Sequence, residues 1–213
     1  MSKSGIRLPW GKDEITLTLP EDWNLLGVMT PATLAGVADV QAEVCRSLET
    51  PVGSPRLAEL AKAGMKVALV IDDDSRPTPV AALLPAALAE LQRGGVSMDD
   101  VTVIPALGVH RPMTLEEVGR RIGPQELSSY RVETHDSDNP EKLAYLGKTS
   151  RGTPVFVNKC AADSNLVVSV GCIEPHIIAS FGGGYKNVIP GIAGRSTIAA
   201  NHALNCAPTT FNN

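Results

Sequence analysis

The chain has 213 residues, of which 20% are charged and 43% hydrophobic, and its formal net charge is −4. This balance is globular rather than disordered. The net acidity, without any run of Lys and Arg, argues against nucleic acid or an anionic membrane surface as a partner. A polar N-terminus unlike a signal peptide, four scattered cysteines and the lack of a long apolar run predict a cytoplasmic protein.

The first third of the chain predicts one strand and two helices. Residues 15–19 (ITLTL) alternate apolar and polar side chains, which is typical of a half-exposed strand. Residues 31–48 carry apolar side chains at helical spacing, after Thr30 as a candidate cap. A break at 51–55 separates this helix from a short one at 56–63.

The middle of the chain predicts a strand–helix–strand unit. Residues 66–71 (KVALVI) are almost wholly apolar and β-branched, which indicates a strand buried on both faces. A helix is expected at 80–93, closed by Gly94, and a second buried strand at 101–105 (VTVIP). Two strands joined in this way lie parallel.

The pattern then repeats. The expected elements are a helix at 114–122, strands near 130–134, 154–157 and 166–170, and a last helix at 196–204. We therefore predict an α/β fold, a Rossmann-like three-layer sandwich with a mostly parallel sheet.

Polar side chains follow three of the predicted strands. The segments are DDDSRPTP after KVALVI, GVHRP after VTVIPAL, and GCIEPH after LVVSV. Ligands of parallel sheets bind beyond the carboxyl ends of the strands. We therefore expect the following side chains at one edge: Asp73, Arg76, His110, Arg111, Glu174 and His176.

The loop that carries Asp73 and Arg76 has two readings. The simpler one is a solvated loop whose aspartates cap a helix. Pro77 and Pro79, however, stiffen the chain next to Arg76. A guanidinium held in this way suits a substrate carboxylate or phosphate.

Two histidines, His110 and His176, follow predicted strands in similar positions. A single histidine is more often structural than catalytic, and the polar turn around His135 favours the structural reading there. Two imidazoles at one edge can instead work as a proton acceptor and a proton donor.

Two further segments could bind a cofactor. The turn FGGGYK places Gly183 and Gly184 before Lys186, so that backbone N–H groups could approach a phosphate and the amine could act as a charge or a nucleophile. It does not match a P-loop, and alone it would more often be a flexible loop. His202 has no partner ligands nearby except Cys206, so a metal there needs ligands from a cofactor or substrate.

Taken together, four segments resemble the nickel-dependent lactate racemase family, in particular its N-terminal domain. They are DDDSRPTP (72–79), GVHRP (108–112), GCIEPHIIASFGGGYKNVIPGIAG (171–194) and TIAANH (197–202). The third is long and unusual in composition, and the resemblance runs from about residue 10 to 205.

The resemblance implies a cofactor. In that family a lysine tethers a nickel-pincer nucleotide, a pyridinium mononucleotide carrying thioamide and thiocarboxylate groups, and Lys186 matches this lysine. His202 matches the one histidine ligand of the nickel, whose other ligands come from the cofactor. Gly183 and Gly184 would contact the cofactor.

The resemblance also implies an isomerase that acts on lactate or a related 2-hydroxy acid. His110 and His176 match the acid/base pair, and Arg76 with Asp73 matches part of the set that orients the substrate. One histidine would take the hydroxyl proton while the C2 hydride passes to the cofactor, and the hydride would then return to the other face.

Members of the family are about twice as long as this chain and have a second domain that closes the cleft. We therefore expect residues 1–213 to be the N-terminal cofactor-binding domain, with the C-terminal domain absent or on a separate chain. Such a fragment, truncated gene or split subunit could be inactive alone. Expected partners are the missing domain and the proteins that synthesise the cofactor.

Two alternatives remain open at this point. The chain could be a non-catalytic nucleotide- or cofactor-binding module that keeps Lys186 without turnover. It could also be a Schiff-base enzyme that uses Lys186 on a carbonyl substrate, although this leaves His202 without a role.

Overall fold

The computed structural model describes residues 5–29, 34–123, 130–204 and 206, and it divides into two compact units, residues 1–36 and 37–213. In the first unit, β1 (Ile6–Trp10) pairs antiparallel with β2 (Asp13–Leu17). The sequence predicted a strand at 15–19, two residues later than β2, and did not predict β1. Every residue of β2 is exposed, so this hairpin has no buried face of its own.

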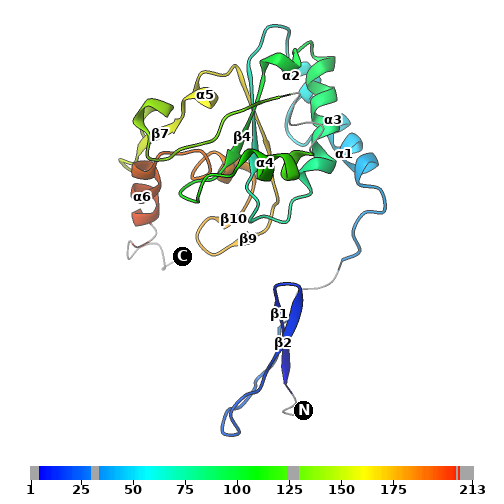
Figure 1. Ribbon diagram of the computed structural model, residues 1–213, viewed down its shortest axis with the longest axis vertical. Helices are drawn as coiled ribbons and strands as arrows, with labels where there is room; N and C mark the ends of the chain where they lie inside the picture. The colour runs from blue at the N-terminus through cyan, green and yellow to red at the C-terminus, as the bar shows by residue number, and fades with distance from the viewer. Residues whose placement is uncertain (1–4, 30–33, 124–129, 205, 207–213) are drawn as a thin grey trace. The chain divides into compact units, whose positions relative to one another are not determined.

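The second unit is built on a parallel sheet, as predicted, and the sheet has four strands (Figure 1). Its strands are β3 (Val67–Asp72), β4 (Val101–Ala106), β5 (Arg131–Val132) and β8 (Leu166–Val170), in the order β5-β4-β3-β8. All six residues of β3 are buried, which explains why its first five, before Asp72, form a continuous apolar run.

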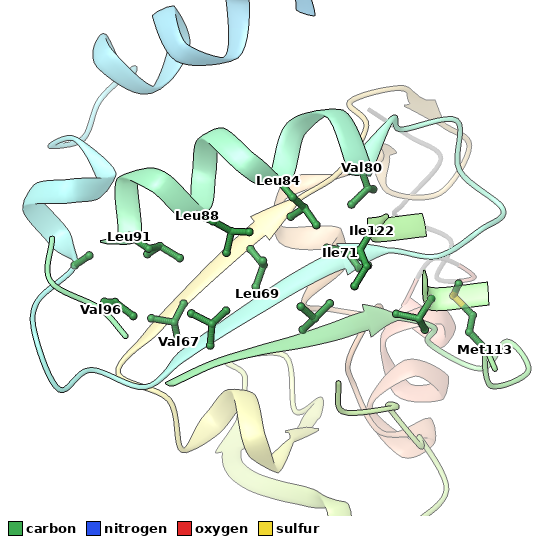
Figure 2. Close-up of a cluster of buried hydrophobic side chains, with 14 of the residues drawn as sticks. Val67, Leu69, Ile71, Val80, Leu84, Leu88, Leu91, Val96, Met113 and Ile122 are labelled. Atoms are coloured by element: carbon green, nitrogen blue, oxygen red, sulfur yellow. The ribbon is translucent and has the colours of Figure 1, made fainter. Parts of the chain in front are cut away.

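Helix α3 (Val80–Arg93) has the predicted bounds and covers one face of the sheet. Figure 2 shows its side chains Leu84, Leu88 and Leu91, spaced at about one helical turn, directed at the β-strand residues below them. Helix α4 (Leu115–Ile122), capped by the Thr114 side chain, adds Val118 and Ile122 to the same core.

Two other helices are shorter than expected. Helix α1 (Val40–Glu49) begins after Asp39, whose carboxylate accepts a 3.0 Å bond from the Ala42 N–H. The predicted first turn lies partly at 30–33, outside the described residues, and residues 34–38 are not helical. Helix α2 (Leu57–Leu60) is a single turn.

The opposite face of the sheet is covered by short elements. Ala68, Val70 and Ile104 pack there against Ala161 of α5 (Lys159–Ala162) and against Ile192. The sheet is therefore buried on both sides, which gives the three layers that the sequence predicted. The described residues of this unit also form 3-10 turns at η1 (Met98–Asp100), η2 (Pro140–Lys142) and η3 (Gly184–Asn187).

The strand predicted at 154–157 is present but lies outside the parallel sheet. It is β7 (Pro154–Asn158), which pairs antiparallel with β6 (Leu143–Lys148), a strand that was not predicted. Helix α6 (Arg195–Leu204) packs against β7, because the Phe156 N–H donates to the Thr197 hydroxyl at 2.8 Å. Within the described part of the chain, no helix is long and apolar enough to cross a membrane.

His135 follows β5 and is only 2% exposed, with Nε2 3.0 Å from the Ala193 carbonyl oxygen. Burial holds the pKa of its imidazole below the usual 6.5, and the bond to Ala193 opposes this only in part. Between the unfolded and the folded pKa, the unfolded chain therefore binds the extra proton. The stability that neutral His135 contributes is present above about pH 6.5 and is lost as the pH falls through the folded pKa.

We expect urea unfolding to show this loss between about pH 7.5 and pH 5.5. The His135→Gln variant should lose less stability over the same interval, because its amide can donate to Ala193 without titrating. Equal losses in the two proteins would show that His135 does not cause the acid sensitivity.

Candidate active site

The segments that follow β3, β4 and β8 surround a cavity of about 320 Å³ in the second unit. Among its lining residues are six side chains that the sequence singled out: Asp73, Arg76, His110, His176, Lys186 and His202. The structure thus brings together residues separated by up to 129 positions in the chain. Gly183 and Gly184 are not among the described residues that line this cavity.

Asp73 and His110 form a pair, with Asp73 Oδ2 2.5 Å from His110 Nδ1. Burial favours the neutral carboxyl, but hydrogen bonds from Ser75 and His110 outweigh it, so the pKa of Asp73 lies below its usual value. The ionised carboxylate accepts the Nδ1 proton and leaves the Nε2 lone pair of His110 available as a base. Asp73 therefore orients His110, which the sequence did not indicate.

Arg76 is paired with Glu174 at 2.6 Å, and both side chains are 30% exposed. The carboxylate holds one terminal nitrogen of the guanidinium, which leaves other N–H groups for a ligand. Glu174 had been placed at this edge by the sequence, but its contact with Arg76 had not.

Asp72 and Arg121 form a mostly buried ion pair beneath the loop, with side chains 5% and 12% exposed. Arg121, from α4, also donates to the backbone carbonyls of Asp72 at 3.3 Å and Arg76 at 2.9 Å. Asp72 further accepts from the Thr78 hydroxyl and, at 3.2 Å, from the Cys172 N–H. This network ties the loop to the ends of β3 and β8, and so positions Asp73 and Arg76.

Sequence reasoning missed Arg121. Its neighbour Arg120 pairs with Glu116 on the exposed side of α4, and both arginines stand in the last turn of the helix. No local signal separates the two, because only the packing of α4 on the sheet directs one of them inward.

His176 ends β9 (Pro175–His176), which pairs with β10 (Ser180–Phe181). Its Nδ1 accepts the backbone N–H groups of Ile178 at 3.2 Å and Ala179 at 3.1 Å. Nδ1 therefore carries no proton, and neutral His176 has its hydrogen on Nε2. Burial, with the nearby cations of Lys186 and Arg76, lowers the pKa of this imidazole.

Lys186 is half-buried in η3, directly after the glycine-rich turn. Burial, and then the charge of Arg76, lowers the pKa of its amine, which raises the share of the nucleophilic neutral form. Gly183 has a φ of +67°, and a Cβ there would lie 2.6 Å from the Cys172 carbonyl oxygen. Gly183 is therefore needed for the turn that places Lys186, rather than as a wall of the cavity.

Asn187, which sequence reasoning also missed, fixes η3 on the sheet. Its side-chain nitrogen donates to the Ser169 hydroxyl at 3.1 Å and to the Val170 carbonyl at 3.3 Å. Asn187 is buried and lines the cavity next to Lys186.

His202 lies in the last turn of α6 and reaches the cavity from the side of β7. Among the described residues, no group of three or more His, Cys, Asp or Glu side chains is arranged to hold a metal ion. The arrangement thus offers one exposed imidazole beside a half-buried amine, and a separate carboxylate–imidazole pair.

Comparison with known proteins identifies the family. The model of the lactate racemase N-terminal domain matches residues 10–211. This chain belongs to the lactate racemase N-terminal domain family. It is 33% identical over 201 residues to the lactate racemase of Thermoanaerobacterium thermosaccharolyticum and 35% identical over 201 residues to that of Lactiplantibacillus plantarum.

The solved structures agree with this assignment to the lactate racemase family. The lactate racemase apoprotein of T. thermosaccharolyticum superposes on 96% of this chain with a TM-score of 0.80 and 32% identity. A Thermotoga maritima protein superposes on 76% of this chain with a TM-score of 0.59 and 23% identity, which shows a shared fold only. The chain spans about half the length of the curated relatives it matches, 47% in both cases.

Proposed function

We propose that this chain is the cofactor-binding half of a lactate racemase-type isomerase that inverts a 2-hydroxy acid at C2. The observation that carries the proposal is one cavity lined by Lys186, His202 and His176 together with the Asp73–His110 pair. A Schiff-base aldolase that used Lys186 would leave His202 without a role. Membership of the family supports the same choice.

The residues present fit a lysine-tethered nickel-pincer nucleotide. Among the described residues no three His, Cys, Asp or Glu side chains are arranged to hold a metal ion, so a metal bound at His202 must bring further ligands of its own. The amine of Lys186, with its lowered pKa, is suited to an amide or thioamide bond with an acyl group. When bound, the cofactor supplies the position that accepts and returns the C2 hydride.

The substrate is held and deprotonated by residues of this chain. Arg76 binds the carboxylate of the 2-hydroxy acid through the N–H groups that Glu174 leaves available. His110 takes the hydroxyl proton on Nε2, and Asp73 stabilises the positive charge that the imidazole gains.

His176 carries its proton on a different ring nitrogen from His110. Its Nε2–H can donate a hydrogen bond to a substrate oxygen while Nδ1 stays bound to the turn after β9. To take a proton for the opposite enantiomer, His176 must change tautomer and release these two backbone bonds. The second half of a two-base mechanism therefore requires movement of the β9–β10 turn.

Turnover needs more than this chain in our proposal, because the curated relatives are about twice as long. The other half, in the same or a separate polypeptide, would close the cavity and exclude water. The four free cysteines suit a reducing cytoplasm, where the proteins that synthesise the cofactor would load it.

The test is to produce the chain together with the cofactor-synthesising proteins and to measure intact mass, peptide masses and nickel. We expect an adduct confined to the Lys186 peptide and about one nickel per chain, as one tethered cofactor requires. Lys186→Arg should lose both, His202→Ala should keep the adduct and lose nickel, and Lys159→Arg should change neither. An unmodified Lys186 without nickel, even when the second half is supplied, would overturn the proposal.

A second candidate is a cofactor carrier without turnover, which needs only Lys186 and His202 among the residues that line the cavity. It predicts the same adduct and nickel content. It differs in showing no racemisation of lactate after the missing half of a relative is added.

A further inference from the structure

A second cavity, of about 260 Å³, opens beside the first. The two share His176, Lys186 and His202, so they meet at the proposed attachment and metal positions. The second cavity adds Arg151 and Asn201, which do not line the first. Nothing in the reaction outlined above uses Arg151.

The second cavity has the charge of an anion site. Its ionisable lining residues are Arg151, His176, Lys186 and His202, and the described residues around it include no carboxylate. The first cavity, in contrast, contains Asp72 and Asp73. An anion entering the second cavity meets cationic or neutral groups only.

Arg151 stands out among the arginines of the site region because it lacks an acidic partner. Arg76, Arg121 and Arg195 each pair with a carboxylate, at Glu174, Asp72 and Asp138. In the described part of the chain no carboxylate lies within ion-pair distance of Arg151. Its planar group of five N–H donors is thus free for a ligand.

Backbone hydrogen bonds hold the turn that carries the exposed Arg151 side chain. It lies in the turn between β6 and β7, where the Thr149 N–H bonds the Thr153 carbonyl at 3.0 Å and the Gly152 N–H bonds the Thr149 carbonyl at 2.9 Å. A third bond joins the Thr153 N–H to the Thr149 hydroxyl at 3.2 Å. Because β7 is bonded to α6, the turn and the helix of His202 form one packed unit.

We propose that Arg151 and the second cavity bind the phosphate of the nucleotide whose pyridine end lies at Lys186 and His202; this rests on the proposed function. A mononucleotide carries its ring and its phosphate at opposite ends of a ribose. The two cavities offer separate places for these ends, joined where Lys186 and His202 line both. A bidentate guanidinium–phosphate contact supplies both charge and direction.

The test compares two probes that differ only in the phosphate, nicotinic acid mononucleotide and nicotinic acid riboside, by titration calorimetry of the unloaded chain. We expect the wild type to bind the mononucleotide about tenfold or more tightly than the riboside. Arg151→Gln should weaken mononucleotide binding by about tenfold and leave riboside binding within about twofold. The mononucleotide affinity of Arg151→Lys should lie between those of the wild type and Arg151→Gln, because lysine keeps the positive charge but lacks the paired N–H donors of the guanidinium.

The matched control is Lys148→Gln, which removes the same charge from an exposed position three residues away in the same hairpin. It should leave both affinities unchanged. Equal binding of the two probes by the wild type, or an equal loss of both in Arg151→Gln, would overturn the phosphate assignment and leave the proposed function standing. Failure of the wild type to bind either probe would also overturn the phosphate assignment, and the Lys186 adduct would then decide the proposed function separately.

Discussion

Replacing His110 by Gln is expected to lower kcat for lactate racemisation by about 10²–10⁴-fold, the usual contribution of a general base. Glutamine can still donate to Asp73, so the loop should keep its structure while the cavity loses its proton acceptor. The measurement is the rate of lactate inversion, followed by chiral chromatography, in cofactor-loaded protein supplied with the second half. Nickel content and unfolding midpoint are recorded on the same samples.

Arg111→Gln is the matched control for His110. Arg111 is the next residue, but its guanidinium forms an ion pair with Glu117 at 2.6 Å and it does not line the cavity. We therefore expect the racemisation rate of Arg111→Gln to differ from that of the wild type by no more than about twofold. A His110→Gln enzyme with a rate close to wild type would remove His110 from the mechanism.

Asp73→Asn separates orientation from proton transfer. An amide in place of the carboxylate can donate to Nδ1, which would turn the proton of His110 toward the cavity and block its use as a base. We therefore expect a loss in kcat approaching that of His110→Gln, with little change in KM. A change in KM alone would instead assign Asp73 to substrate binding, the role that the sequence had suggested.

Replacing Arg121 by Met is expected to lower the free energy of unfolding by about 3–5 kcal/mol, because it leaves the Asp72 carboxylate buried without its counter-ion. The Thr78 hydroxyl and the Cys172 N–H remain as its hydrogen-bond donors, and they do not neutralise the charge. Urea unfolding at neutral pH gives this free energy, provided that the m-value is unchanged.

Arg120→Met is the control for Arg121, since it removes an exposed ion pair from the same turn of α4 and should cost no more than about 1 kcal/mol. The double variant Asp72→Asn/Arg121→Met should recover part of the loss, because no buried charge is left unpaired. Equal losses in the free energy of unfolding for Arg120→Met and Arg121→Met would contradict a structural role for the Asp72–Arg121 pair.

Much of the fold follows from local pattern. The apolar run of β3, the amphipathic stretch of α3 and the apolar β8 were predicted with bounds within one residue of those observed, since burial on one or two faces leaves a period in the sequence. The α1 helix was overextended because apolar spacing continues before Asp39, where the actual cap begins the helix. Strand β6 is half-exposed and has no comparable signal.

The chemistry of the site was also visible before the structure, but only as a set of residues. Parallel strands end at one edge of a sheet, so polar side chains after β3, β4 and β8 had to gather there. Lys186 and His202 were placed by resemblance to the family rather than by this rule. The cavity is lined by Asp73, Arg76, His110, His176, Lys186 and His202, whereas Arg111 and Glu174 are not among its described lining residues.

Only the tertiary structure decided which side chain works with which. Asp73 pairs with His110 across 37 positions, Arg121 with Asp72 across 49, and Arg76 with Glu174 across 98. Such pairs depend on strand register, helix rotation and side-chain rotamers, none of which leaves a periodic trace along the chain. Residue types and strand ends can therefore be read from the sequence, whereas the roles of Asp73 and Arg121 and the second cavity at Arg151 required the packed structure.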